Sequence, residues 1–272
     1  MSENDVNYTD YTLVIPSHGA YEDMCLNFLH LLRKNWQDCP FRIVFAIHTK
    51  PIKFEGCDTL FCEKTNNLMG CLAKTIEKYP SPYYIVFLPD ALICKPIVQR
   101  EVDILLHQLK QLNPAYCRIR PTRVNTHSKK ASSWLRYIHT QDRYVHSFIA
   151  FLASKQFLLS EIKSCSSDFD FEVKYLQLVN CKSASYHFSD HFVLTKDIFH
   201  ILHGIIKGKW DRIVLHHLRR DSLIIKRAKL SWLESIYHYV HIRIMPLFPN
   251  TIRLKIKQFV AKMCKKDFVT KE

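Results

Sequence analysis

The stretch Tyr-Tyr-Ile-Val-Phe-Leu-Pro-Asp-Ala-Leu-Ile, residues 83–93, is the clearest indication of fold in this 272-residue sequence. Its aromatic and β-branched residues run without a charge up to Pro89 and Asp90, which is typical of a strand buried on both faces in a parallel sheet. Ligands of open α/β sheets bind beyond the carboxyl ends of the strands. Asp90 is therefore a candidate contact for a phosphate-bound metal or a sugar hydroxyl, although an Asp in this place is also a common turn former.

Alternating strands and helices surround this stretch. The pattern predicts strands at 11–16, 41–47, 59–63, 83–90 and 116–121, helices at 21–35, 67–79 and 97–112, and a strand passing into a helix over 148–162. Asn66 or Thr65 is the expected cap of the second helix. Strand, helix and strand within about forty residues form a right-handed parallel βαβ unit. The fold class predicted is α/β, a Rossmann-like sandwich with a central, mainly parallel sheet.

Composition excludes several other classes. The chain is 47% apolar and 24% charged, which is ordinary for a globular protein, and it contains no uncharged apolar run of about 18 residues that would span a bilayer. Its ten Cys include no Cys-x-x-Cys pair, and no His-Glu-x-x-His occurs, so zinc is not expected. The pairs His187/His191 and His200/His203 are expected on the surface or on helix faces. The polar opening has no secretory signal, so we expect reduced thiols and a cytoplasmic location.

The formal charge of +14 is concentrated at the end of the chain. From Lys226 onward there are eleven Lys and Arg and three acidic residues. Apolar residues recur there at helical spacing, namely Leu230, Leu233, Tyr237, Val240 and Ile244, and then Ile252, Ile256, Phe259, Val260 and Met263. We expect a domain at 1–225 and a basic amphipathic helical tail at 226–272. Such a tail suits an anionic membrane surface, and a helical hairpin docked on the core or on a second subunit is the alternative.

Two further segments are candidates for function. Residues 122–146 interleave basic and aromatic side chains, either as a mobile loop over a site or as a solvated excursion. Residues 168–172, Asp-Phe-Asp-Phe-Glu, place three carboxylates on alternate positions. Glycine-rich phosphate loops and the Gly-x-Ser-x-Gly nucleophile motif are absent, which argues against ordinary dinucleotide enzymes, P-loop NTPases and serine hydrolases. Polar residues at the strand ends remain, among them Ser17, His18 and His48.

Several of these pieces together resemble a known family. They are Ile-Pro-Ser at 15–17, Asn-Asn at 66–67, Ile-Val-Phe-Leu-Pro-Asp-Ala-Leu-Ile-Cys-Lys-Pro at 85–96, the strand 116–121, the acidic element 168–172 and Gly-Ile-Ile-Lys-Gly-Lys-Trp at 204–210. Over about residues 11–222 the chain resembles nucleotide-sugar glycosyltransferases of the GT-A type. The most similar group acts in bacterial cell-surface polysaccharide synthesis, that is, of lipopolysaccharide or capsule.

The resemblance implies a role for each matching position. Pro16, Ser17 and His18 would lie against the nucleotide base and ribose, and Asn66 or Asn67 would help to close that pocket. His48, as a polar residue at a strand end, is a further candidate for donor binding. Asp90 would face the donor diphosphate and a metal ion. Glu172 would be the general base that takes a proton from the acceptor hydroxyl in an inverting hexosyl transfer, with Asp170 and Asp168 as other candidates. A solvated helix acid is the plain alternative for Glu172.

One departure from the family pattern concerns the metal. Pro89-Asp90 stands where the family has two or more acids, so a single carboxylate remains. Mg²⁺ or Mn²⁺ held by Asp90 and the diphosphate, transfer without a metal, and lost activity all stay open. Arg118, Arg120 and Lys209 could instead neutralise a leaving diphosphate.

The expected partners are therefore a nucleotide-sugar donor, a glycan or lipid-linked acceptor and an anionic membrane at its inner face. Two other functions compete with this one. The isoelectric point near 9.3 suggests a nucleic-acid-binding protein, although no recognisable module is present and we expect no nucleic acid as partner. A catalytically inactive glycosyltransferase-like scaffold is the other.

Overall fold

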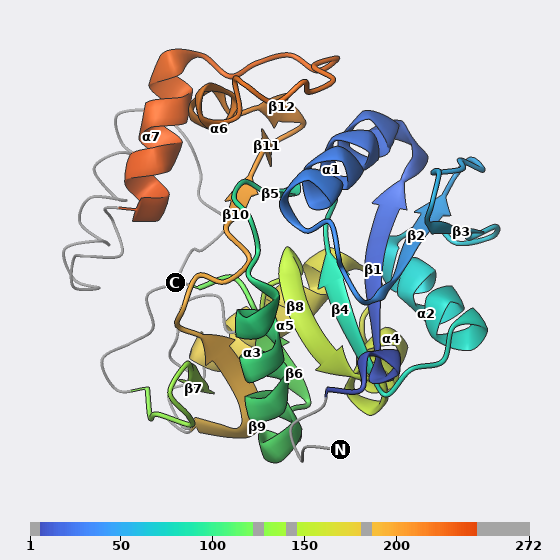
Figure 1. The fold of residues 1–272 in the computed structure, drawn as a ribbon, viewed down its shortest axis with the longest axis vertical. Coiled ribbons are helices and arrows are strands. Elements are labelled where there is room, and N and C mark those ends of the chain that lie inside the picture. The colour runs from blue at the N-terminus through green and yellow to red at the C-terminus, as the bar shows by residue number, and fades with distance from the viewer. Residues whose placement is uncertain (1–5, 122–127, 140–145, 181–186, 244–272) are drawn as a thin grey trace.

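The computed structural model describes residues 6–121, 128–139, 146–180 and 187–243, with the side chains of 175–187 and 241–243 left out. Within these residues a large twisted sheet carries helices on both faces, and a smaller lobe follows at the end of the described chain (Figure 1). The α/β class with a Rossmann-like sandwich is confirmed.

The strands of the main sheet are β1 (Tyr11–His18), β2 (Arg42–His48), β3 (Asp58–Phe61), β4 (Tyr83–Phe87), β6 (Tyr116–Arg118), β7 (Leu135–His139), β8 (Ala150–Ser154) and β9 (His187–Leu194). Two small ribbons pair β5 (Ala91–Ile93) with β10 (Ile201–His203), and β11 (Ile205–Ile206) with β12 (Lys209–Trp210). The helices are α1 (Glu22–Asn35), α2 (Leu68–Lys78), α3 (Gln99–Leu112), α4 (Lys155–Ser164), α5 (Asp168–Asn180), α6 (Arg212–His217) and α7 (Trp232–Arg243), with short 3-10 turns at Tyr8–Asp10 and Gly19–Tyr21.

The main sheet has the order β3-β2-β1-β4-β8-β6-β9-β7. Its first four strands are parallel to one another, which confirms the βαβ unit predicted for the amino-terminal half. Strand β8 then enters antiparallel between β4 and β6, and β7 is antiparallel to β9. The carboxyl ends of β1, β2 and β4 therefore meet at one edge of the sheet.

Successive side chains along each strand point to opposite faces of the sheet, so the core is divided into two layers, one on each face. Leu13 and Ile15 of β1 face the layer of α1 and α3, whereas Val14 faces the layer of α2, α4 and α5. All three side chains are 0% exposed. A third cluster joins Met24 and Leu31 of α1 to β5, to Trp210 and to α6, so the smaller lobe packs on α1.

The structure corrects several local predictions. The strand predicted at 83–90 ends at Phe87, because Leu88 and Ala91 close a turn around Pro89 and Asp90. The cap of α2 is Asn67, whose side chain accepts from the Gly70 N–H, rather than Asn66 or Thr65. The segment 122–146 contains strand β7 and is not simply a loop.

The remaining part of that segment, and the second predicted tail helix at 252–263, lie outside the described residues. Of the first predicted tail helix, Leu230 precedes α7 and is buried, whereas Leu233, Tyr237 and Val240 lie on α7 and are exposed.

Candidate functional site

Two histidines mark the carboxyl ends of the first two parallel strands. His18 ends β1 and His48 ends β2, and their rings meet edge to face with centroids 4.7 Å apart. His48 is buried, and its Nδ1 has no hydrogen-bond partner among the described residues. Burial lowers the pKa of His48, and the neighbouring His18 lowers this pKa further, while Asp168 opposes the shift. Asp168 therefore lies near the end of β2.

Asp90 lies in the turn that follows β4, as a turn-forming Asp would, and its role at a donor site stays a prediction. The Ala91 N–H donates to the Leu88 carbonyl at 2.9 Å, which makes a β-turn with Pro89 at its second position. The Asp90 carboxylate is also a polar group of the interior. Its Oδ2 lies 2.8 Å from Nε2 of His203, and its buried Oδ1 has no hydrogen-bond partner in the part of the chain that is described.

Helix α5 brings the acidic element to the same edge. Ser167 begins the helix, since its Oγ accepts from the Asp170 N–H at 3.0 Å. One turn further on, Glu172 accepts from the Phe148 N–H at 2.8 Å. Burial raises the pKa of Glu172; the Phe148 hydrogen bond opposes this, Asp168 adds to it, and His203 lowers it. The charges of Asp168 and His203 thus both act on Glu172.

One hydrogen bond and three electrostatic influences link residues that are far apart in the sequence. Asp90 contacts His203, His203 and Asp168 influence Glu172, and Asp168 influences His48. We call this group, Asp90, Asp168, Glu172, His48 and His203, the carboxylate–histidine cluster. It supplies a carboxylate with a raised pKa, which suits a general base, next to a carboxylate paired with an imidazole.

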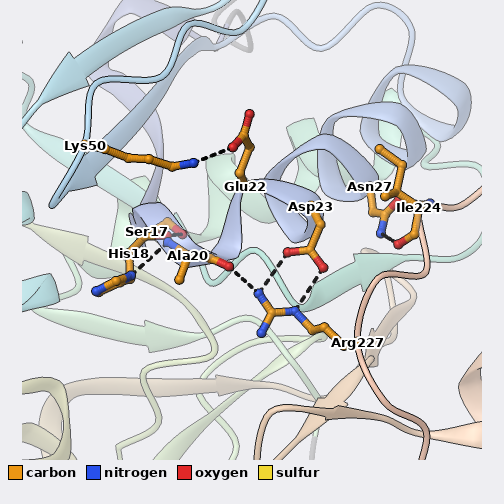
Figure 2. A network of polar contacts seen from close by, with 9 residues as sticks. All are labelled: Ser17, His18, Ala20, Glu22, Asp23, Asn27, Lys50, Ile224 and Arg227. Carbon is orange, nitrogen blue, oxygen red and sulfur yellow. Dashed lines mark hydrogen bonds and ion pairs between the residues drawn. The ribbon is translucent and has the colours of Figure 1, made fainter.

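The turn after β1 is held by a polar network, shown in Figure 2. The Ala20 N–H donates to His18 Nδ1 at 2.9 Å, and the Ser17 hydroxyl donates to the His18 carbonyl at 3.2 Å. Ser17 is buried and His18 is exposed. Gly19 leaves room for this turn, because a Cβ there would lie 2.5 Å from Cγ of Lys50. Pro16 is buried within β1.

Asn67 connects the start of α2 to the segment before α5. Its Nδ2 donates to the Ser166 carbonyl at 2.8 Å, while its Oδ1 caps α2. Asn66 is exposed beside it. Asn66 and Asn67 therefore lie next to the acidic element.

Other predicted residues have different surroundings. Asp170 accepts from both the N–H and the hydroxyl of Ser166, and the Ser166 side chain is the main cause of the lowered pKa of Asp170. Asp170 therefore stabilises the start of α5, and its lowered pKa makes it a poor general base. Arg118 is only 2% exposed, and its charge acts on Tyr116 and His146 in the interior. Arg120 is half-buried beyond β6, and Lys209 is exposed in β12.

A divalent cation would find a small number of protein ligands here. No group of three or more His, Cys, Asp and Glu that could hold a metal occurs among the described residues. Asp90 Oδ1 is nevertheless a buried acceptor without a partner there, and His203 adds an imidazole beside it. The Asp90 carboxylate fits an ion that takes its remaining oxygens from a diphosphate and water, and the His203 imidazole would orient that carboxylate.

His203 is the residue that sequence reasoning missed. The pair His200/His203 was expected at a surface or helix face, but His203 lies on strand β10, which pairs with β5 directly after Asp90. His191 is likewise buried, in β9. The one available signal for His203 was its position directly before Gly204. That glycine lets Leu92 and Trp210 approach, since a Cβ would lie 2.8 Å from Leu92 Cδ1.

Comparison with known proteins gives similarity in fold only. No family model and no curated protein matches the chain. Among solved structures, Staphylococcus aureus TarS has a TM-score of 0.44 at 14% identity over 68% of this chain, which spans about a third (35%) of TarS.

Two smaller enzymes match over most of their own length. CMP:2-keto-3-deoxy-manno-octonic acid synthetase, in complex with CTP, has a TM-score of 0.47 at 13% identity, over 77% of this chain and 97% of its own. UDP-glucose pyrophosphorylase, in complex with UDP-glucose, has a TM-score of 0.43 at 5% identity, over 68% of this chain and 89% of its own. At these values the likeness is confined to the path of the chain and assigns neither a family nor a substrate.

Proposed function

We propose that the protein is a glycosyltransferase that moves a sugar from a nucleotide-sugar donor to a glycan or lipid-linked acceptor of the bacterial cell surface. The observation that carries the proposal is the carboxylate–histidine cluster. It places Glu172, whose pKa is raised, near the Asp90–His203 pair at the carboxyl edge of the sheet. Ligands of open α/β sheets bind at this edge.

Each residue then has a defined task. Glu172 accepts the proton of the acceptor hydroxyl, and a base of raised pKa is better matched to this transfer near neutral pH. The acceptor oxygen bonds to the anomeric carbon while the bond from that carbon to the diphosphate breaks, and the electron pair leaves with the diphosphate. The configuration at the anomeric carbon is inverted.

The donor is held by the other residues of this edge. The turn at His18 and the side chains of His48 and Asn67 lie where a nucleotide would be bound. Asp90, oriented by His203, would hold Mg²⁺ or Mn²⁺ on the diphosphate, and this ion would neutralise charge on the leaving group. Burial of Arg118 makes Arg120 and Lys209 the better candidates for direct contact with the diphosphate.

The decisive experiment measures release of nucleoside diphosphate from a panel of nucleotide sugars with a lipid-linked or oligosaccharide acceptor. Turnover by the wild type that is lost in both Glu172→Gln and Asp90→Asn, with unchanged circular dichroism, would support the proposal. Turnover that neither substitution alters would overturn the assigned roles. Binding of oligonucleotides without any turnover would indicate a nucleic-acid-binding protein instead.

We also place the protein at the inner face of the cell membrane, because helix α7 turns its apolar side outward. Ser235 is 0% exposed, and its hydroxyl accepts from the Arg212 N–H. The exposed side chains of α7 include six large apolar ones, between 36% and 81% exposed: Trp232, Leu233, Ile236, Tyr237, Tyr239 and Val240. We call them the outward face of α7.

The net positive charge of the segment that contains this face favours an anionic lipid surface as its occupant. Residues 212–240 contain six Lys and Arg and two acidic residues. Trp and Tyr prefer the membrane–water interface, and each basic residue near an anionic surface adds about 1 kcal/mol. No helix among the described residues is long and apolar enough to cross a membrane. A second copy of the chain is the competing occupant.

A further inference from the structure

The segment between α6 and α7 lies along α1 through three contacts, which follow one another every three residues of the segment. We call residues 219–230 the strap. Asp221 pairs with Lys34 at 2.5 Å, Ile224 exchanges two backbone hydrogen bonds with the Asn27 side chain, and Arg227 pairs with Asp23. The strap therefore runs antiparallel to α1, from the carboxyl end of the helix to its first turn.

Arg227 makes the most extensive of these contacts (Figure 2). Its Nε and Nη2 donate to the two carboxylate oxygens of Asp23 at 3.0 and 2.8 Å. Its guanidinium also lies 4.0 Å from the ring centroid of Tyr21. Asp23 is only 7% exposed, so the pair is shielded from solvent and has a fixed geometry.

A third hydrogen bond connects Arg227 to the turn after β1. Its Nη2 donates to the Ala20 carbonyl at 2.6 Å, while the Ala20 N–H donates to His18 Nδ1 at 2.9 Å. Ala20 is thus held by Arg227 at its carbonyl and by His18 at its amide. In the neutral form this leaves the His18 proton on Nε2, away from the turn.

We infer that Arg227 is a positioning residue for nucleotide binding, which holds the turn of residues 17–21, and with it the His18 ring, in its binding geometry. This inference rests on the proposed function, because it takes His18 as part of the donor site. Arg227 acts through Ala20 and Asp23 and contacts none of the residues of the carboxylate–histidine cluster in the structure described. It also makes the donor site depend on a residue more than two hundred positions away.

Arginine is required for this task by its shape. A guanidinium can serve Asp23 and Ala20 together and stack on Tyr21, whereas a lysine ammonium is a point charge without a planar fork. Arg227→Lys is therefore the informative variant, since it keeps the charge and a folded chain. Lys34→Ala is the matched control: it removes the strap contact at the far end of α1, where no donor residue lies.

The test combines hydrogen exchange with nucleotide titration of the full chain. We expect Arg227→Lys to speed amide exchange in a peptide covering residues 17–24 and to weaken binding of the preferred nucleoside diphosphate roughly tenfold. Lys34→Ala should leave both unchanged. Unaltered exchange and affinity in Arg227→Lys would overturn the inference, as would equal losses in Lys34→Ala.

Failure of the proposed function has a different signature. If the wild type binds no nucleoside diphosphate, the donor site itself is wrongly assigned, and the inference about nucleotide binding falls with it. Faster exchange confined to residues 17–24 in Arg227→Lys would still establish that the contacts of Arg227 with Ala20 and Asp23 order this turn. Normal wild-type binding with an unaffected Arg227→Lys variant would overturn the positioning role alone.

Discussion

Helices α5 and α7 both depart from the arrangement of α2, in different ways. Helix α2 buries Met69, Leu72 and Ile76, as an amphipathic helix on a sheet should. Helix α5 buries Phe171 but also turns Glu172 inward, and it leaves Phe169 62% exposed. Helix α7 buries a serine and exposes its apolar residues. Burying a carboxylate and exposing apolar side chains to water are both unfavourable, and these two departures are the basis of the proposed general base on α5 and the proposed membrane contact of α7.

The largest effect should follow from removing the inward carboxylate of α5. Glu172→Gln keeps the shape and can retain the Phe148 contact, but it cannot accept a proton. We expect kcat to fall by about 10² to 10⁴ while the melting temperature stays near that of the wild type. Asp170→Asn, on the same helix, is the control and should retain most of the activity. Full activity in Glu172→Gln would show that the inward carboxylate is structural.

The next effect concerns the partner of Asp90. His203→Gln removes the imidazole that lies 2.8 Å from the Asp90 carboxylate, and we expect activity to fall about 10- to 100-fold. The matched control is His200→Asn, three residues earlier. His200 has a φ of +47°, a conformation that asparagine tolerates. Steady-state kinetics with varied Mg²⁺ and Mn²⁺ would separate the two variants, and equal losses would contradict a special role for His203.

A smaller effect is expected at the outward face of α7. Leu233 is 81% exposed, so Leu233→Glu should barely change stability, yet it should weaken binding to vesicles containing anionic lipid roughly tenfold. Leu159→Glu, at an exposed leucine of α4, is the control. Co-sedimentation with anionic and neutral vesicles provides the measurement. Unchanged sedimentation together with loss of a dimer in analytical ultracentrifugation would assign the face to a second copy.

The smallest expected effect concerns the pH dependence of stability and a histidine packed against the buried side of α5. His146 is 1% exposed, and its ring centroid lies 5.6 Å from that of Phe171. Burial lowers the pKa of His146 well below its ordinary value, and His191 and Arg118 lower it further. Below a pH of about 6.5 the His146 position therefore binds a proton in the unfolded chain but not in the folded chain. The free energy of unfolding consequently decreases as the pH is lowered.

Replacing His146 should make the free energy of unfolding less dependent on pH. We expect His146→Phe to reduce the pH slope of the unfolding free energy by up to about 1.4 kcal/mol per pH unit below pH 6.5. Urea unfolding at several pH values measures the slope, with His30→Phe at an exposed position as the control. An unchanged slope in His146→Phe would assign the acid sensitivity to other groups.

Much of the fold was readable because local patterns and tertiary packing agree. The strands at 11–16 and 41–47 and the helix at 21–35 are confirmed, since buried strands and amphipathic helices leave strong signals. The sequence contains no signal for the antiparallel position of β8 beside β4, because strand order depends on packing between distant segments. The reduced role of Asp170 was equally hidden, since it depends on a hydrogen bond to Ser166.

The site was predictable only in part for the same reason. Strand ends and an acidic element identified Asp90, His48 and Glu172 as candidates. His203 and Arg227 reach the site through the β5–β10 pairing and the strap, two long-range contacts that no local spacing encodes. Their roles, like those of the other site residues, stay predictions until the variants are measured.

The most direct test of the central claim is a thermal-shift screen of the wild-type protein with UDP-, GDP-, CMP- and dTDP-sugars, each with and without Mg²⁺ or Mn²⁺. A ligand that binds only the folded chain raises the melting temperature by mass action. A donor site at the carboxyl edge of the sheet predicts a selective rise with the sugars of one nucleotide. A melting temperature that no nucleotide sugar changes, but that oligonucleotides raise, would contradict it.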